Sequence, residues 1–189
     1  MCSSDLLKRR EREELTVPLD FYFMKPINIG CLKDMNLNAT QIIPRLWLGN
    51  YYNSTDYNFL KRNRIDVIVN CTKELPFPQI RSIYKYRVPV DDNLQKIEIA
   101  SMADWLGKIL PILYVHYQNG SHILVHCHAG MQRSAIVVLS FLYAYCHVNP
   151  KVAYNQMRSL RPIVFVPYIN FANSFRLFFG EYAYQQLIS

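Results

Sequence analysis

The sequence predicts an α/β fold in which a central, mainly parallel, twisted sheet is flanked by helices. Apolar runs rich in β-branched residues, at 65–70 and 122–126, are typical of buried parallel strands. Apolar residues recur with helical spacing at 97–117 and 133–147. Because a parallel connection has to cross the sheet, usually through a helix, this alternation of strands and helices favours parallel pairing.

The other expected elements follow from the same patterns and from turn and cap residues. In chain order they are a strand or hairpin at 42–49, a short helix at 54–62, a strand at 84–90, and helices at 150–159 and 168–187. Ser54 or Thr55 is the expected cap of the short helix. Pro111 lies within 97–117 and is expected to kink or divide that helix, because proline lacks a backbone N–H.

The chain of 189 residues has the length of one domain with a proper hydrophobic core. Residues 1–38 have a charged start and a middle punctuated by proline and glycine, so we interpret them as an extension that precedes a domain at 39–189. The five cysteines are odd in number and irregularly spaced, which favours a reducing, intracellular setting. Neither a signal peptide nor a membrane span is expected from the apolar runs.

The formal net charge of +7 favours anionic partners in general. No zinc finger or aromatic-rich RNA-binding signature accompanies it, so phosphorylated substrates are expected rather than nucleic acid. The basic run Lys8-Arg9-Arg10 is followed directly by glutamates, which favours a solvated tail over a nuclear-targeting signal. We therefore expect a cytoplasmic protein, with the nucleus as the alternative.

The most informative segment runs from His126 to Ser134, where five residues separate Cys127 from Arg133. It joins an apolar strand to a helical pattern, so backbone N–H groups and a helix N-terminus are aimed at the centre of the loop, a geometry that binds phosphate. A thiol in that place is stabilised as a thiolate nucleophile, and a guanidinium grips two phosphate oxygens at once. The segment predicts cleavage of phosphate esters through a phosphocysteine intermediate.

Two simpler interpretations of Cys127 compete with this one. Most single buried cysteines are small core residues, but a polar loop that contains glycine is a poor packing site. His126 and His128 flank the cysteine and raise the alternative of a metal site, yet three consecutive residues do not readily converge on one ion. The expected reaction therefore uses no metal and no cofactor.

The leaving group of such a reaction needs a proton, which a carboxylic acid on a neighbouring loop usually supplies. Asp91 and Asp92 follow the strand expected at 84–90. In a parallel sheet, the end of that strand lies on the same side as the strand end that carries Cys127. The alternative is that the two acids only mark a turn.

Five segments, in order, resemble the cysteine-based dual-specificity protein phosphatases of the protein tyrosine phosphatase superfamily, and in particular its small atypical or viral members. They are Ile43–Gly49, Ile65–Thr72, Val88–Asp92, Val125–Ala135 and the tail pieces Arg161-Pro162 and Asn170-Phe171. The resemblance covers residues 40–187, approximately, and implies a protein-tyrosine-phosphatase-like fold. It also implies an enzyme that hydrolyses phosphotyrosine, phosphoserine and phosphothreonine in proteins.

The resemblance implies roles at the matching positions. Cys127 is the nucleophile, and Arg133 grips the phosphoryl group. Asp92 is favoured over Asp91 as the general acid. Ser134 helps the thiolate to leave when water attacks the phosphoenzyme, or is a simple cap in the first helical turn.

Three further expectations concern the surroundings of the nucleophile. His126 orients the loop and supports the thiolate rather than acting as a base. The phosphate cradle is formed by the backbone N–H groups of residues 128–133, which are His128, Ala129, Gly130, Met131, Gln132 and Arg133. The Gln132 side chain is longer than in many members and is expected to line the pocket rim or to meet the substrate backbone. Cys71 is either a core residue or the partner of Cys127 in a protective disulfide formed under oxidation.

Other functions remain as alternatives. RNA 5′-triphosphatases and phosphoinositide phosphatases of the superfamily share the loop, but the former differ in its interior and the latter tend to carry lysines, which are absent between 127 and 133. A non-catalytic phospho-binding module would have lost the cysteine, the arginine or the acid. The segment from Asp92 to Cys127 is also longer than is usual in the family resembled.

Overall fold

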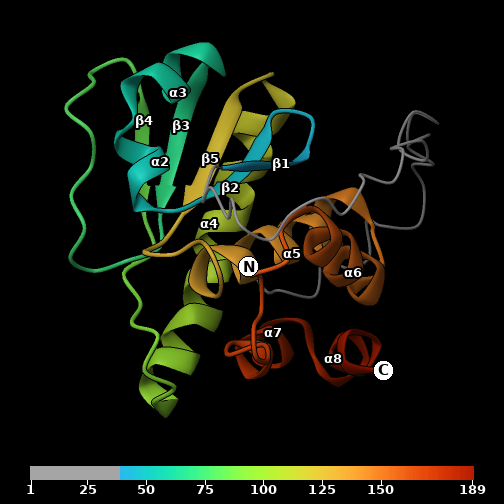
Figure 1. Cartoon of the computed structure of the whole chain (residues 1–189). Helices are drawn as coiled ribbons and strands as arrows, with labels where there is room; N and C mark the ends of the chain where they lie inside the picture. The colour runs from blue at the N-terminus through green and yellow to red at the C-terminus, as the bar shows by residue number, and fades with distance from the viewer. Residues whose placement is uncertain (1–38) are drawn as a thin grey trace, which may run out of the picture. The chain divides into compact units, whose positions relative to one another are not determined.

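A five-stranded sheet in the order β1-β2-β5-β3-β4 forms the centre of the computed structural model, which describes residues 39–189 (Figure 1). The strands are β1 Thr40–Ile43, β2 Leu46–Gly49, β3 Ile65–Asn70, β4 Tyr84–Arg87 and β5 His122–His126. The pair β1 and β2 is antiparallel, and the other three pairs are parallel. The predicted mainly parallel sheet is confirmed, while the predicted extension at 1–38 lies outside the described residues.

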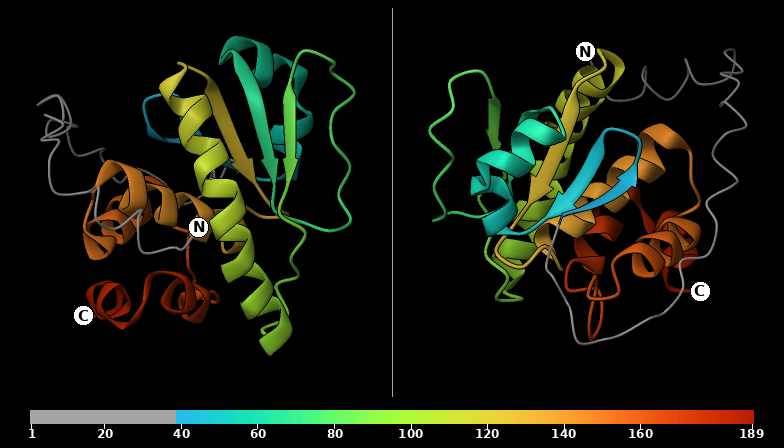
Figure 2. Two further views of the ribbon diagram at one scale, coloured as in Figure 1. Left: turned by 180° about the vertical axis from the view of Figure 1, so that it is seen from behind. Right: turned by 45° about the horizontal axis from the view of Figure 1, so that its top comes forward.

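Helices cover both faces of this sheet. They are α2 Tyr51–Thr55, α3 Tyr57–Arg62, α4 Lys96–Gln118, α5 Arg133–Cys146, α6 Pro150–Leu160, α7 Ala172–Phe179 and α8 Glu181–Ile188. The view from behind has α4 in front of the strands, and α2 and α3 lie on the opposite face (Figure 2). This arrangement is that of an α/β fold with crossover helices.

The alternation of side chains along β5 separates two apolar cores. Ile123 and Val125 belong to the larger core, which is formed with α4, α5 and the C-terminal helices. Leu124 belongs to a smaller core on the other face, together with Ile68 of β3. All four side chains are fully buried, which explains why β3 and β5 read as continuous apolar runs in the sequence.

Two predicted helices are each divided in the structure. The stretch 54–62 belongs to α2 and α3, because Asn50 caps α2 by accepting a hydrogen bond from Asn53 N–H and Asp56 caps α3 by accepting one from Phe59 N–H. The predicted cap at Ser54 or Thr55 is therefore wrong. The C-terminal stretch at 168–187 splits into α7 and α8 at Gly180, whose φ of +88° ends the first helix.

Two other predicted boundaries differ as well. Helix α4 runs through Pro111 without a division. The carbonyl that loses its partner there is that of Gly107, and because both residues are exposed, water can satisfy it. Strand β4 ends at Arg87, and Val88 and Val90 continue as buried loop residues. Among residues 39–189, no helix is long and apolar enough to cross a membrane.

Candidate active site

Cys127 lies directly after β5, and the loop that follows leads into α5 at Arg133. Its side chain is 3% exposed. The sulfur accepts hydrogen bonds from the backbone N–H of Gly130 at 3.3 Å and from the Ser134 hydroxyl at 3.2 Å. The strand, loop and helix predicted around the nucleophile are confirmed, and they turn donors toward the sulfur.

The electrostatic surroundings of Cys127 favour the thiolate. Burial by itself raises the pKa of this thiol, but hydrogen bonds from the Ser134 hydroxyl and N–H, the charge of Arg133 and the Met131 N–H together hold the pKa below its usual value. Ser134 contributes the two largest of these stabilising effects. Its hydroxyl points to the sulfur, which is where a residue that assists the departing thiolate would have to lie.

The backbone of the cradle approaches the end of β2 very closely at Gly130. This glycine has a φ of +70°, and a Cβ placed there would lie 2.4 Å from the carbonyl oxygen of Gly49. No other residue type fits such an approach. His128 is exposed, and its carbonyl accepts a hydrogen bond from Tyr51 N–H of α2. The loop is thus fixed by backbone contacts on its strand side.

Arg161 holds the loop on its other side. This residue, directly after α6, is buried, and its guanidinium donates to the carbonyl oxygens of Gly130 at 3.1 Å and Ala129 at 3.2 Å. With these carbonyls drawn outward, the N–H groups of the same peptides face the phosphate position. The sequence pointed to Arg161 only as part of the tail resemblance and gave it no role in the site.

The Gln132 side chain does not line the pocket rim, contrary to the expectation from the sequence. It is 5% exposed, and its amide nitrogen donates to the carbonyl oxygens of Val166 at 3.1 Å and Tyr168 at 2.9 Å. Its amide oxygen accepts from Asn170 N–H at 3.1 Å. A long side chain is needed here because it joins the start of α5 to the segment between α6 and α7.

His126 is fully buried at the end of β5, and one ring nitrogen, Nδ1, lies 3.3 Å from the Cys127 carbonyl oxygen. Burial lowers the pKa of His126 to about 4, so the ring is neutral near pH 7. A neutral ring does not stabilise the thiolate by charge. Its contact is with the backbone of the nucleophile. Among residues 39–189, no three or more His, Cys, Asp or Glu side chains are grouped as metal ligands.

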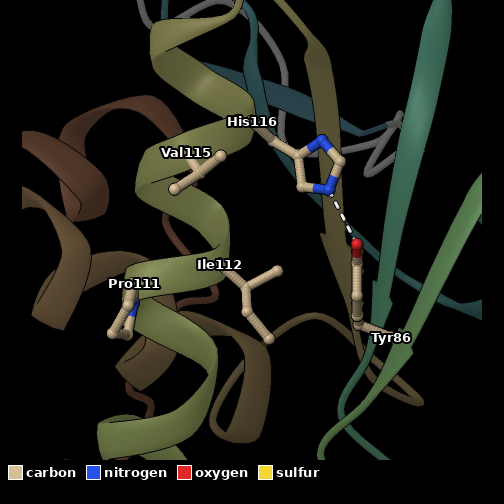
Figure 3. A pocket seen from close by; sticks show the side chains of 5 residues that line it. All are labelled: Tyr86, Pro111, Ile112, Val115 and His116. Atoms are coloured by element: carbon tan, nitrogen blue, oxygen red, sulfur yellow. Dashed lines mark hydrogen bonds between the residues drawn. The ribbon is translucent and has the colours of Figure 1, made fainter.

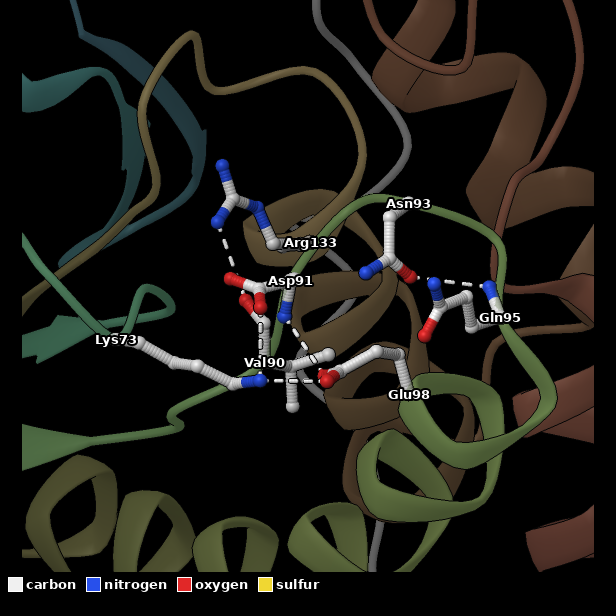
Figure 4. Close-up of polar contacts among 7 residues, drawn as sticks. All are labelled: Lys73, Val90, Asp91, Asn93, Gln95, Glu98 and Arg133. Carbon is white, nitrogen blue, oxygen red and sulfur yellow. Dashed lines mark hydrogen bonds and ion pairs between the residues drawn. The ribbon is translucent and has the colours of Figure 1, made fainter.

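Arg133 connects the cradle with the loop that precedes α4, which comprises residues 88–95 and is called the acid loop below. Its guanidinium donates to the carbonyl oxygen of Val90 at 3.1 Å (Figure 4). Its Nε is buried and has no hydrogen-bond partner in the part of the chain described. A buried donor without a partner fits a group that receives an anionic oxygen of the substrate.

The two candidate acids have different surroundings. Asp91 forms an ion pair with Lys73 at 2.8 Å, and its backbone N–H donates to Glu98 of α4 at 2.9 Å. Asp92 is exposed, and one carboxylate oxygen accepts a hydrogen bond from the Asn170 side chain at 2.7 Å. Asp91 is therefore occupied by a cation, whereas the partner that Asp92 has in the described part of the chain is neutral.

Cys71 follows β3, the strand next to β5, and is fully buried. Its backbone N–H donates to the His126 carbonyl oxygen at 2.8 Å. Burial, followed by the negative charge of Cys127, raises the pKa of the Cys71 thiol well above its usual value, while Arg133 opposes this. The Cys71 thiol is therefore neutral, and it belongs to the same apolar core as Cys127.

A separate groove lies between β4 and α4 and shares no residue with the cradle. It is lined by Tyr86, Pro111, Ile112, Val115 and His116 (Figure 3). The Tyr86 hydroxyl lies 2.8 Å from Nε2 of His116, so the two polar groups in this groove satisfy each other. The groove offers mainly apolar surface and none of the groups that bind phosphate.

Residues 46–180 match the family model described as the dual specificity phosphatase catalytic domain. The chain belongs to this family. The match begins at β2 and ends at Gly180, so it contains the candidate nucleophile Cys127, the candidate cradle and the acid loop.

A human relative has a similar sequence, and two solved structures have a similar fold. The domain is 28% identical to human dual specificity protein phosphatase 16 over 146 residues, which are 77% of this chain and 21% of the relative. The chain thus spans only about a fifth of the length of that relative. The crystal structure of human DUSP28 is similar with a TM-score of 0.66 and 24% identity, covering 74% of this chain and 91% of that one. OH1, a tyrosine phosphatase from the Orf virus, has a TM-score of 0.57 and 22% identity, covering 75% and 86%.

Proposed function

We propose that this protein is a metal-independent protein phosphatase that hydrolyses phosphotyrosine, phosphoserine and phosphothreonine through a phosphocysteine intermediate. Membership of the dual specificity phosphatase family supports the enzyme class. The observation that carries the proposal is the position of the Cys127 sulfur, which accepts hydrogen bonds from Gly130 N–H and the Ser134 hydroxyl inside a loop closed by Arg133. Such a sulfur is a thiolate aimed at a bound phosphoryl group.

In the first proposed step, the Cys127 thiolate attacks phosphorus, and the S–P bond forms while the bond to the leaving oxygen breaks. Asp92, protonated, gives its proton to that oxygen. Arg133 and the cradle N–H groups bind the remaining phosphoryl oxygens, whose charge they stabilise in the transition state.

In the second proposed step, water hydrolyses the phosphoenzyme. The Asp92 carboxylate takes a proton from the water as its oxygen attacks phosphorus, and the S–P bond breaks. The sulfur leaves as a thiolate, which the Ser134 hydroxyl stabilises through the hydrogen bond it already makes to that atom. Phosphate leaves, and the enzyme returns to its starting protonation state.

The decisive experiment is hydrolysis of a generic aryl phosphate in the presence of a chelator. We expect full activity in the wild type and none in Cys127→Ser, because a serine hydroxyl is not ionised near neutral pH. Cys146→Ser, in the last turn of α5, is the matched control and should remain active. Activity that survives in Cys127→Ser, or that needs a divalent metal, would overturn the mechanism.

The substrate class is tested by a panel of phosphopeptides with phosphotyrosine, phosphothreonine or both. An RNA with a 5′-triphosphate and a phosphoinositide serve as the alternative substrates of the superfamily. The cradle of this protein contains no lysine, which favours the phosphopeptides over the phosphoinositide. A protein that binds phosphopeptides but hydrolyses none of these substrates would instead be a phospho-binding module.

The compartment that we propose is the cytoplasm, with the nucleus as the alternative. A thiolate nucleophile works only where it is kept reduced. Fractionation of cells that express the full chain, followed by an activity assay of each fraction, tests this placement.

For Cys71 we propose a core-packing role, with a protective disulfide to Cys127 under oxidation as the alternative. In that alternative, peroxide would oxidise the Cys127 thiolate to a sulfenic acid, and the Cys71 sulfur would then displace water to form a disulfide. Peroxide-treated protein would then yield a peptide crosslinked between the two cysteines, and reduction would restore activity. Absence of that crosslink would leave Cys71 as a core residue.

A further inference from the structure

The charged groups around Asp91 come from three separate parts of the chain. Lys73 follows β3, Asp91 lies in the acid loop, and Glu98 lies in the first turn of α4 (Figure 4). The Lys73 ammonium forms ion pairs with both carboxylates, and the second oxygen of Glu98 accepts a hydrogen bond from Asp91 N–H at 2.9 Å. We refer to Lys73, Asp91 and Glu98 as the acid-loop clasp.

Lys73 is itself held in place by the turn that carries it. Arg87 donates to the carbonyl oxygens of Thr72 at 2.7 Å and Lys73 at 3.1 Å. The buried Asn70 side chain accepts hydrogen bonds from the N–H and the hydroxyl of Thr72. These hydrogen bonds fix the backbone of Lys73 just after β3, and the ammonium extends from there to Asp91 and Glu98.

Glu98 is 7% exposed, which is unusual for a carboxylate. A buried carboxylate needs charged or hydrogen-bonding partners, and here both of its oxygens have one. One partner is the N–H of the residue directly before the proposed general acid. Glu98 thus fixes the backbone of Asp91, and with it the direction in which the acid loop runs from Val90 to Asp92.

The rest of the acid loop is exposed, and few polar contacts hold it among the described residues. One of them lies within the loop itself, where Gln95 N–H donates to the Asn93 side chain at 3.0 Å. Asp92 is exposed, and within residues 39–189 its carboxylate is held by the hydrogen bond from the Asn170 side chain. Since a general acid must lie within hydrogen-bond reach of the leaving oxygen, its rate contribution depends on contacts that fix the neighbouring backbone.

We propose that the acid-loop clasp positions Asp92 for proton donation, with Glu98 as the positioning residue that holds the Asp91 backbone and Lys73 as the cation that keeps Glu98 in place. The ion pair with Lys73 also occupies the Asp91 carboxylate and so gives the two neighbouring acids different roles. This proposal rests on the proposed phosphatase function, and it assigns to Lys73 and Glu98 a part in the first chemical step.

The leaving group of the substrate distinguishes this role from a purely structural one. 4-Nitrophenyl phosphate releases a stable anion that needs little protonation, whereas phenyl phosphate releases one that needs a proton from the acid. Loss of acid positioning lowers kcat/KM for phenyl phosphate alone, whereas general loss of folded protein lowers both equally. The ratio of the two kcat/KM values is therefore the measured quantity.

We expect Glu98→Ala to raise that ratio in favour of 4-nitrophenyl phosphate by about 10-fold or more, since misplacing a catalytic group by about 1 Å costs rate on the order of 100-fold. Lys73→Met should shift the ratio in the same direction. Glu98→Gln keeps an oxygen for Asp91 N–H but loses the charge that pairs with Lys73, so a smaller shift is expected. Glu74→Gln is the matched control, an exposed acid next to Lys73, and should leave the ratio unchanged.

Unchanged ratios in Glu98→Ala and Lys73→Met, or equal losses for both substrates, would overturn the proposal. Inhibition by vanadate reports an intact cradle in every variant and should not change. If Glu98→Ala does not fold, Lys73→Met and Glu98→Gln decide the question by the same ratio. Failure of the phosphatase function itself is recognised separately, because then Cys127→Ser would equal the wild type on both substrates.

Discussion

The cradle and the acid loop meet at one site but are built in different ways. The cradle follows a buried strand, begins a buried helix and is fixed by backbone contacts to Gly49 and by the buried Arg161. The acid loop is exposed around Asp92 and is fixed by side chains from other elements. The candidate nucleophile thus has an enclosed position, whereas the position of the candidate acid depends on a few polar contacts at the surface.

Two residues connect these regions. Arg133 belongs to the cradle and donates to the Val90 carbonyl of the acid loop. Gln132 binds the backbone of Asn170, whose side chain holds Asp92. Substitution of Arg133 or Gln132 should therefore affect both the cradle and the acid loop. Substitution of a residue that contacts one of the two regions should affect that region alone.

The largest effect is expected for Arg133→Lys, which breaks the connection between the regions. Lysine lacks the planar fork and cannot both grip phosphoryl oxygens and reach Val90, so we expect kcat/KM to fall by about 100-fold to 1,000-fold, the range seen when a transition-state donor is lost. Steady-state kinetics with an aryl phosphate measure this. The exposed Arg62→Lys on α3 is the control, and a loss no larger than in that control would contradict the role of Arg133.

The next effect concerns the acid loop alone. Asp92→Asn should lower kcat/KM for phenyl phosphate by about 100-fold, because general acid catalysis is worth that much, and should spare 4-nitrophenyl phosphate. Asp91→Asn should have a smaller effect, since Asp91 is already paired with Lys73. The opposite ranking of the two variants would transfer the acid role to Asp91.

Ser134→Ala tests the cradle alone through its pH dependence. The reactive form is the thiolate, which exists above the Cys127 pKa, and the hydrogen bonds from Ser134 help to lower that pKa. Removing the hydroxyl raises the pKa, so the acidic limb of kcat/KM should move to higher pH. A rise of one unit lowers the rate about 10-fold at a pH below both pKa values.

The rate of alkylation by iodoacetate as a function of pH measures this thiol pKa directly. Ser140→Ala is the control, because Ser140 lies in the same helix and its buried hydroxyl has no partner among the described residues. A profile in Ser134→Ala that coincides with the wild type would mean that the hydroxyl does not stabilise the thiolate.

The smallest effect is expected for Gln132→Ala. The substitution removes the hydrogen bonds that the Gln132 side chain donates to the Val166 and Tyr168 carbonyls, each worth about 0.5–1.5 kcal/mol, so the free energy of unfolding should decrease by about 1–3 kcal/mol. Activity should fall only a few-fold, through the weaker hold on Asn170. Thermal unfolding measures the loss of stability, and steady-state kinetics well below the transition temperature measure the loss of activity. A fall in kcat/KM as large as that of Arg133→Lys would contradict the minor part that we assign to Gln132 in holding the acid loop.

The sequence predicted the cradle well because its parts are neighbours along the chain. Cys127, Gly130 and Ser134 lie within eight positions, so strand, glycine loop and helix start can be recognised from local patterns. The buried runs of β3 and β5 were recognised for the same reason, since full burial on both faces leaves a continuous apolar run. The mainly parallel sheet followed from the order of these elements.

Element boundaries were predicted less well, because they depend on side-chain caps that compete over short distances. Asp56 lies inside the helix predicted at 54–62. In the structure its carboxylate instead accepts a hydrogen bond from Phe59 N–H and caps a new helix, α3. Pro111 has the character of a helix breaker, yet α4 continues because the carbonyl it would leave unpaired is on an exposed face.

The candidate nucleophile, the candidate cradle and the pair of candidate acids could be predicted from the sequence, since residue type and local spacing are enough to propose them. The groups that surround them could be recognised only in the folded chain. Four residues that contact the cradle or the acid loop are far from Cys127 along the chain, namely Lys73, Glu98, Arg161 and Asn170. No local pattern in the sequence distinguishes them from other surface charges or tail residues. Folding brings them together because parallel strands end at one edge of the sheet, where the loops and helix ends that follow converge.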